Sequence, residues 1–191
     1  IFFSTSQVGK EAPEIGKGSS KLKNANDVNE LKKLDIILTC QGGDYTQSIY
    51  PELRKIGWEG YWIDAASTLR MNQSSTLVLD PVNLNIVKNS LTTNKKDFIG
   101  ANCTVSLMLM ALHSLFEKDL IEWVTSMTYQ AASGAGAKNM RELISQMAFI
   151  ANGAKNLNED PLENILNIDK KVSELINAPN YPIENFGAPL A

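Results

Sequence analysis

Histidine and cysteine are scarce in this sequence, whose 191 residues include one histidine and two cysteines, Cys40 and Cys103. One imidazole and two distant thiols give no credible ligand set for a zinc or iron–sulfur site. Two cysteines also make no disulfide framework of the kind that staples small secreted domains. We therefore expect no metal centre and a location in the reducing cytoplasm.

Basic clusters and long apolar runs are missing as well. The 18 lysines and arginines are scattered among 21 acidic residues, for a formal net charge of −3, which argues against a nucleic-acid partner. No apolar run reaches the roughly 18 residues that a membrane-spanning helix needs. With 43% hydrophobic residues, the sequence predicts one large or two small globular domains with a substantial core.

Both ends of the sequence lack the features that usually open or finish a domain. It begins with IFFSTSQ, which has no methionine and already resembles the end of a strand. It closes on NFGAPLA, which carries no helix or strand signal. We expect both ends to lie inside a longer protein, whose N-terminal targeting segment, if it has one, would not be visible here.

Residues 1–100 alternate between strand and helix patterns, which is typical of an α/β sheet with crossover connections. Residues 35–40 (DIILTC) are a continuous apolar run, which predicts a parallel strand covered on both faces. Residues 27–34 have helical spacing behind Asp27 as a possible N-cap. The other predicted segments are strands at 1–4, 60–67, 75–80 and 97–100, a loop or ragged edge strands at 7–24, a helix ending at 56, and a helix or loop at 81–91.

The pattern changes near Gly100–Asn102, where we place a boundary between two incomplete domains, residues 1–101 and 102–191. The second is predicted to mix helices with a strand. Its elements are a buried helix from 103 to about 116, a long strand at 119–130, a Gly/Ala turn, and helices at 139–154 and 160–176, with Pro161 in the first turn of the last.

Cys103 lies at the junction of a small polar turn and a long apolar run. Asn102 is a good N-cap residue, so Cys103 would occupy the first helical turn, where free backbone N–H groups and the helix dipole favour an anionic thiolate. A buried structural cysteine fits the same spacing. His113 would lie about 15 Å along this helix and on another face, so it cannot serve Cys103 as a base. Either the chemistry needs no histidine or the base lies outside this sequence.

Polar segments follow several of the predicted strands. The glycines of QGGDY (41–45) would let a ligand approach the backbone, although a bare GG is more often only a turn. The hydroxyls of STSQ (4–7) could hold a ribose phosphate. Arg70 follows a strand, where a guanidinium could grip a phosphate or carboxylate at two points, with a surface ion pair as the plainer alternative.

A similar signal follows the predicted strand at 119–130. Gln130 would end that strand, and Ser133 and Gly134 would lead into a helix N-terminus. Such a terminus is suited to an anion or an amide.

Taken together, these segments resemble aspartate-β-semialdehyde dehydrogenases of the bacterial type. The resemblance runs from one end of the chain to the other, but it covers only the middle of the family's protein. The matching stretches, in order, are FFSTSQ, DIILTCQGGDYT, GYWIDAASTLRM, LDPVN, GANCTVSLMLM, TYQAASGAGAKNMREL and NFGAPLA.

The resemblance implies a Rossmann-like NADP(H)-binding domain followed by an α+β catalytic and dimerisation domain, in a homodimer. It also implies an oxidoreductase that interconverts aspartyl phosphate and aspartate semialdehyde with NADPH, on the route to lysine, methionine and threonine. Inorganic phosphate would be the other reactant.

The resemblance also assigns site residues. Cys103 matches the nucleophile that forms an acyl-thioester, and Asn102 beside it matches a substrate-binding residue. Gln130 matches a residue that orients the substrate, and Arg70 matches a phosphate ligand. The matching cofactor contacts are Thr5 and Ser6 for the 2′-phosphate, with Gln41, Ser133, Gly134 and Pro161.

Some family features are not found in the sequence. The first strand with its Gly-rich turn should precede Ile1, and the catalytic histidine and a carboxylate-binding arginine should follow Ala191. We therefore expect these residues alone to be inactive. The alternatives are a non-catalytic binding or assembly fragment, or a related enzyme such as an N-acetylglutamyl-phosphate reductase.

Overall fold

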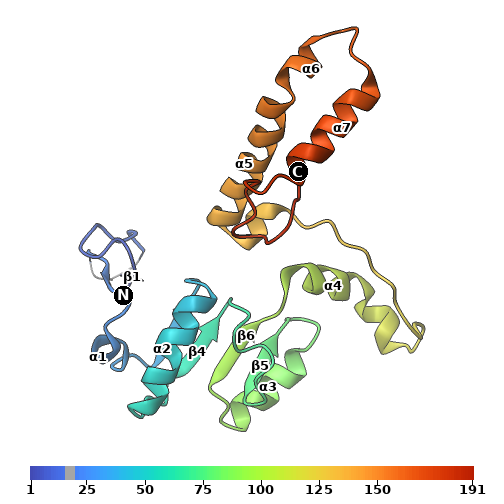
Figure 1. The fold of residues 1–191 in the computed structure, drawn as a ribbon. Coiled ribbons are helices and arrows are strands. Elements are labelled where there is room, and N and C mark those ends of the chain that lie inside the picture. Colours follow the sequence, from blue (N-terminus) through green and yellow to red (C-terminus); the bar gives the residue numbers. More distant parts are fainter. Residues whose placement is uncertain (16–19) are drawn as a thin grey trace. The chain divides into compact units, whose positions relative to one another are not determined.

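The computed structural model describes residues 1–15 and 20–191, which form two compact units, residues 1–124 and 125–191 (Figure 1). Residues 16–19, inside the segment predicted as a loop or ragged edge strands, lie outside the described residues. Among the helices of the described residues, none is long and apolar enough to cross a membrane. The boundary that we predicted near residue 101 stays a prediction.

A four-stranded parallel sheet forms the centre of the first unit. Its strands stand in the order β3 (Ile36–Thr39), β4 (Tyr61–Asp64), β6 (Asp97–Gly100) and β5 (Ser75–Val78). A separate parallel pair joins β1 (Phe3–Ser4) to β2 (Lys23–Asn24). Because all neighbours in the sheet are parallel, the carboxyl ends of its strands share one edge. The predicted α/β architecture is confirmed.

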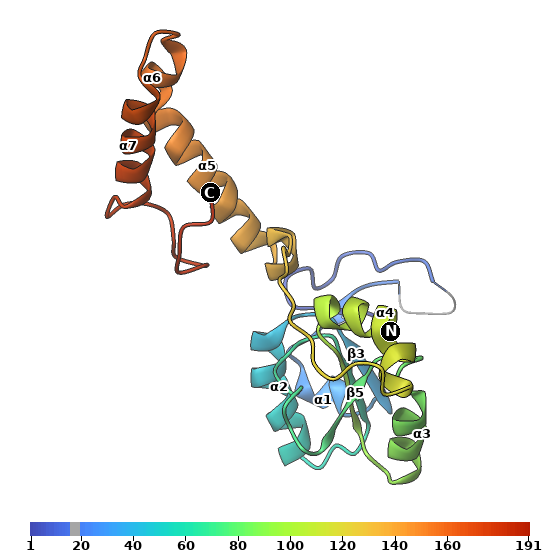
Figure 2. The same ribbon diagram turned by 90° about the vertical axis from the view of Figure 1, so that its right-hand side faces the viewer.

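Helices form two of the three connections between the strands of this sheet. Figure 2 shows α2 (Gly43–Lys55) on one face of the sheet and α3 (Leu84–Thr92) on the other. The short α1 (Val28–Leu31) begins where predicted, because the Asp27 side chain accepts hydrogen bonds from the Asn29 and Glu30 amides. α2 joins β3 to β4 and α3 joins β5 to β6, and these two crossovers are of the kind that a parallel sheet requires.

The core lies between α2 and the sheet. Trp62 of β4 is fully buried, and its ring contacts those of Tyr45, Tyr50 and Trp58 at centroid distances of 6.4, 5.5 and 6.3 Å. Its large apolar surface makes it the centre of the packing. The buried cluster consists of Ala25, Leu31, Ile37, Tyr45, Ile49, Leu53, Trp58, Trp62, Leu69 and Ile99.

The prediction that residues 35–40 are covered on both faces is wrong. Ile37 and Thr39 are buried, but Ile36 and Leu38 are 58% and 71% exposed. β3 is an edge strand, and α3 packs against β5 at the opposite end of the sheet. One face of β3 therefore stays open to solvent within the first unit.

Two expectations for the segment after β6 are also wrong. The helix α4 (Cys103–Glu117) forms as predicted, but none of its side chains is buried. Apolar side chains lie all around this helix, so it would need packing partners on every side to be buried. The described residues of its unit do not provide those partners. Residues 119–130 form no strand, because no described strand pairs with their backbone, and Tyr129 is 95% exposed.

The described part of the second unit is helical. The 3₁₀ helix η1 (Ala132–Ala135) precedes α5 (Ala137–Gly153), α6 (Lys155–Glu159) and α7 (Ile165–Ile176). The predicted helix at 160–176 begins late. Asn164 caps α7 by accepting a hydrogen bond from the Leu166 amide, so Pro161 lies in the turn before the helix and not in its first turn.

Two buried side chains of α5 bind the end of the chain. Glu142 accepts hydrogen bonds from the Asn185 amide (2.6 Å), its side chain (2.7 Å) and the Phe186 amide (2.9 Å). One turn further on, Gln146 accepts from the Leu190 amide at 2.8 Å and donates to the Pro182 carbonyl at 2.8 Å. Burial alone would raise the pKa of Glu142, but the donated hydrogen bonds outweigh it and hold this pKa below its ordinary value.

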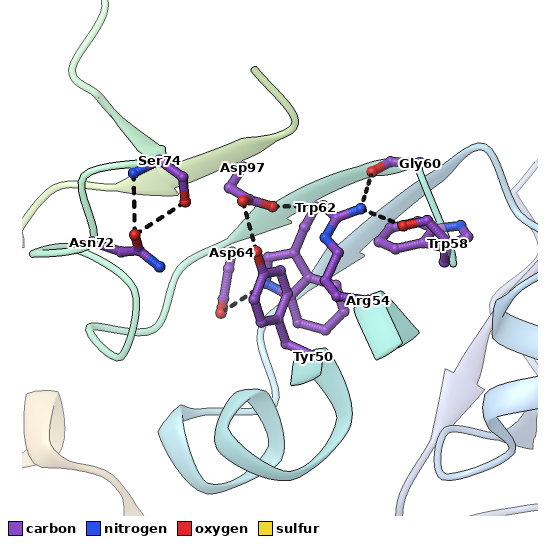
Figure 3. A network of polar contacts seen from close by, with 9 residues as sticks. All are labelled: Tyr50, Arg54, Trp58, Gly60, Trp62, Asp64, Asn72, Ser74 and Asp97. Carbon is purple, nitrogen blue, oxygen red and sulfur yellow. Dashed lines mark hydrogen bonds and ion pairs between the residues drawn. The ribbon is translucent and has the colours of Figure 1, made fainter. Parts of the chain in front are cut away.

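At the amino ends of β4 and β6, a polar network fastens α2 to the sheet (Figure 3). Asp97 accepts hydrogen bonds from Arg54 at 2.6 Å and from the Tyr50 hydroxyl at 2.7 Å. Arg54 also donates to the Trp58 and Gly60 carbonyls. Burial, and then the hydrogen bond to Asp97, raise the pKa of Tyr50. Since these groups satisfy one another, we assign the network to stability.

Candidate functional site

The carboxyl edge of the sheet carries the predicted nucleophile. β6 ends at Gly100, and Cys103 is the first residue of α4. The Asn102 side chain accepts a hydrogen bond from the Val105 amide at 3.0 Å, which confirms the predicted N-cap. This cap fixes the start of α4, and the exposed Cys103 thiol stands there, where helix geometry favours a negative charge.

Arg70 reaches this same strand end. Its Nε donates to the Gly100 carbonyl at 2.9 Å, and its Nη2 donates to the Ala65 carbonyl at 3.2 Å. In the described part of the chain no carboxylate pairs with Arg70, so the surface ion pair that we kept as an alternative does not form. The guanidinium instead rests on the backbone that leads directly to Asn102 and Cys103.

Two predicted cofactor residues meet at the ends of β1 and β3. The Thr5 hydroxyl donates to the Gln41 side-chain oxygen at 3.1 Å. The turn after β1 is shaped by the Ser4 hydroxyl, which accepts from the Ser6 and Gln7 amides at 3.3 and 3.0 Å. The hydroxyls of Thr5 and Ser6 are exposed beside this turn, an arrangement that fits a phosphate group of a dinucleotide.

The turn after β3 has glycines that its geometry requires. Gly42 has a φ of +94°, a backbone conformation that is strained for any residue with a side chain. A Cβ on Gly43 would lie 2.9 Å from the Thr68 hydroxyl, which donates to the Gly43 carbonyl at 3.3 Å. The QGG turn and the Arg70 loop therefore touch each other.

The described residues offer Cys103 no histidine partner. His113, the one histidine of the sequence, lies 3.4 Å from Glu117 on the same helix. At the rise of an α-helix it is about 15 Å from Cys103. Cys40, the last residue of the run that we predicted to be covered on both faces, is exposed like Cys103.

In the second unit, the structure brings three predicted residues together. The Gln130 amide lies so close to Gly134 that a Cβ there would come within 2.6 Å of its Nε2. Ser133 and Gly134 belong to η1, and α5 begins only after Gly136, which has a φ of +98°. They therefore lead into a helix N-terminus, as predicted. The predicted strand that Gln130 would end does not form.

Pro161 is not brought together with these residues. It follows α6, whereas η1 precedes α5, and α5 spans 17 residues, or about 25 Å. Its assignment as a cofactor contact rests on the resemblance alone.

Sequence reasoning overlooked Asp64 and Thr46. Asp64 ends β4 and is 2% exposed, yet the Thr46 hydroxyl, the Trp62 indole and the Ala66 amide all donate to its carboxylate. An aspartate directly after the apolar YWI run was the available signal, because buried carboxylates require such partners.

Two sequence families match the chain. The family described as semialdehyde dehydrogenase, NAD binding domain, matches residues 1–90. The family described as semialdehyde dehydrogenase, dimerisation domain, matches residues 112–191. The first unit therefore contains a nicotinamide-dinucleotide-binding fold.

Solved structures give the same relationship. Aspartate semialdehyde dehydrogenase from Francisella tularensis is 46% identical with a TM-score of 0.80, over 95% of this chain and 49% of its own. Aspartate semialdehyde dehydrogenase II from Vibrio cholerae, complexed with ASA, is 26% identical with a TM-score of 0.61, over 78% and 43% of the two chains. The present chain thus spans about half the length of the proteins that it matches.

Proposed function

The chain belongs to the aspartate-semialdehyde dehydrogenase family, and from this premise we propose that it carries the thioester-forming and NADP(H)-binding parts of such an enzyme. The reaction is the reversible, phosphate-releasing reduction of aspartyl phosphate to aspartate semialdehyde. The observation that carries the proposal is Arg70 held on the Gly100 carbonyl, three residues before the exposed thiol that begins α4.

Cys103 acts as the nucleophile. Its thiolate attacks the acyl carbon of aspartyl phosphate, forming a C–S bond as the C–O bond to phosphate breaks. When bound, NADPH supplies the hydride that the resulting thioester accepts. Breakage of the C–S bond then releases the aldehyde and restores the thiolate on Cys103.

Arg70, Asn102 and Gln130 serve the substrate in this proposal. Arg70 uses two of its N–H groups on backbone carbonyls, which leaves the others to bind the phosphate group. Asn102 sets the position of the thiol through its cap, and Gln130 orients the aspartyl group. Fixing both reactants in this way lowers the entropic part of the barrier.

The cofactor is NADP(H) rather than NAD(H). The support is the pair of exposed hydroxyls of Thr5 and Ser6 after β1, which suit a 2′-phosphate. Gln41, Ser133 and Gly134 are its further contacts, and the resemblance adds Pro161, which the structure does not place beside Ser133 and Gly134. The match to a dimerisation domain supports a homodimer, and two free cysteines suit the cytoplasm.

The test is Cys103→Ala in the complete protein. We expect turnover of aspartate semialdehyde with NADP and phosphate to fall by about three orders of magnitude or more, with the circular dichroism spectrum unchanged. Mass spectrometry of the quenched wild-type enzyme should find the acyl adduct on the peptide of Cys103. Cys40→Ser is the matched control and should keep that adduct.

Retained turnover in Cys103→Ala would remove this thiol from the nucleophile's role. A folded wild-type protein that binds NADP but forms no adduct would instead favour the alternative of a non-catalytic binding or assembly fragment.

A further inference from the structure

A buried carboxylate lies between the two loops that carry Gln41 and Arg70. Asp64 Oδ2 accepts from the Thr46 hydroxyl at 2.6 Å and from the Trp62 indole at 3.2 Å, the contact drawn in Figure 3. Asp64 Oδ1 accepts from the Ala66 amide at 2.8 Å. Its two oxygens therefore receive donors from α2, from β4 and from the loop after β4.

The donor from this loop shares a peptide group with a contact of Arg70. The Ala66 N–H binds Asp64, and the Ala65 carbonyl of the same peptide accepts from Arg70 Nη2 at 3.2 Å. A peptide group is planar and trans, so its N–H and C=O point in opposite directions. Fixing the N–H on a rigid, buried carboxylate therefore fixes the direction of the carbonyl that holds the guanidinium.

Thr46 ties the carboxylate to α2. The Thr46 amide donates to the Gly42 carbonyl at 3.3 Å in the first turn of this helix. Its hydroxyl, buried in the core, makes the short contact with Asp64. The carboxylate is thereby held from a second element and cannot follow movements of the Arg70 loop.

We propose that Asp64 is a positioning residue for phosphate binding, which it controls through the Ala65–Ala66 peptide and Arg70. The inference rests on the proposed function, in which Arg70 binds the phosphate group. Both carboxylate oxygens are required. An asparagine has one acceptor oxygen, so in either orientation its NH₂ group would face a donor that Asp64 now accepts.

The experiment measures the KM for inorganic phosphate in the complete enzyme during oxidation of aspartate semialdehyde. Asp64→Asn should raise it about tenfold, the equivalent of one well-placed interaction, with a less than about twofold change in the KM for NADP. Thr46→Val removes one donor and keeps the shape of the side chain, so it should raise the phosphate KM by a smaller factor. Thr46→Ser keeps the hydroxyl, so its phosphate KM should equal that of the wild type.

Thr76→Val is the matched control, because Thr76 of β5 is buried like Thr46 of α2 and its hydroxyl has no hydrogen-bond partner among the described residues. It should leave the phosphate KM unchanged. In an enzyme that already carries Arg70→Ala, adding Asp64→Asn should change the phosphate KM by less than about twofold, because the effect of Asp64 passes through Arg70.

The outcomes separate the two proposals. If Arg70→Ala raises the phosphate KM but Asp64→Asn raises it by the same factor with and without Arg70, Asp64 does not act through Arg70 and this inference fails alone. If Arg70→Ala leaves the phosphate KM unchanged, the proposed role of Arg70 fails and the inference falls with it. Should Asp64→Asn not fold, the Thr46 variants decide by the same comparison.

Discussion

Among single residues, Arg70 shows how a side chain can be held by backbone alone. Its Nε donates to the carbonyl of Gly100, which ends β6, and its Nη2 donates to that of Ala65, which follows the neighbouring strand β4. These two bonds fix the plane of the guanidinium, and a planar group held at two points presents its remaining N–H groups in a fixed direction. The residue is thus preorganised before any ligand arrives.

Arg70→Lys should therefore be damaging although it keeps the charge. One ammonium cannot occupy both carbonyls and still present a fork to phosphate. We expect the KM for phosphate to rise about tenfold or more, with a smaller change in the KM for NADP, measured by steady-state kinetics.

Arg141→Lys is the control for that substitution, because Arg141 is exposed on α5. It should behave like the wild type. An Arg70→Lys enzyme with normal phosphate dependence would show that Arg70 only supports the loop.

No pattern in the sequence could predict these contacts. The acceptors are backbone carbonyls of Ala65 and Gly100, which any residue type would supply, and Gly100 is 30 positions away from Arg70. The Asn102 cap, by contrast, was predictable, because its bond to Val105 is local. Local hydrogen bonds can be predicted from residue type, whereas distant backbone acceptors cannot.

Among the secondary structure elements, α5 binds the last residues of the chain with two side chains on one face. Glu142 and Gln146 are one helical turn apart, and both accept N–H groups of residues 185–191. A carboxylate that accepts several hydrogen bonds is favoured in its charged form, which keeps its pKa low. The attachment of this segment therefore depends on pH.

The folded pKa of Glu142 is depressed, so its stabilising effect is present above the unfolded pKa of about 4 and is lost as pH falls through the lower folded value. We expect the NMR signals of the Asn185 and Phe186 amides to move toward disordered positions below about pH 4. Glu142→Gln should show the same change at neutral pH.

The neighbouring Glu184 is exposed, and Glu184→Gln should leave those signals in place. Native Asn185 and Phe186 signals in Glu142→Gln would mean that the charge is not needed for this attachment.

The predictions for secondary structure elements were wrong where strand formation or burial depends on a second element that pairs or packs with the first. β4 and β6 form close to the predicted positions, because short apolar runs between turn signals are local. The β-rich composition of residues 119–130 does not by itself make a strand, because a strand needs a partner for its backbone. The apolar run of β3 and that of α4 likewise indicate a preference for burial, but they do not say what covers them.

For the molecule as a whole, the Arg54–Asp97 pair is an ionic link between α2 and the amino edge of the sheet (Figure 3). The Asp97 side chain is 7% exposed and that of Arg54 is 23% exposed. Removing one partner of such a pair leaves the other charge poorly solvated, which costs more than the pair itself contributes.

Asp97→Ala should lower the free energy of unfolding of the first unit by about 3 kcal/mol or more, measured by urea unfolding with tryptophan fluorescence. Glu30→Gln disrupts the more exposed ion pairs with Lys23 and Lys33 and should have a much smaller effect. Equal losses in the two variants would contradict our assignment of this network to stability.

The strand order also bears on synthesis at the ribosome. β6 stands between β4 and β5 but follows both in the chain, so the two have no common partner until residues 97–100 have been translated. β3 and β4 can pair earlier, yet β5 must wait unpaired while α3 is made. When β4 and β5 have left the ribosome but residues 97–100 are still inside its exit tunnel, the edges of β4 and β5 are therefore exposed together, and chaperone binding should be strongest at that stage of synthesis.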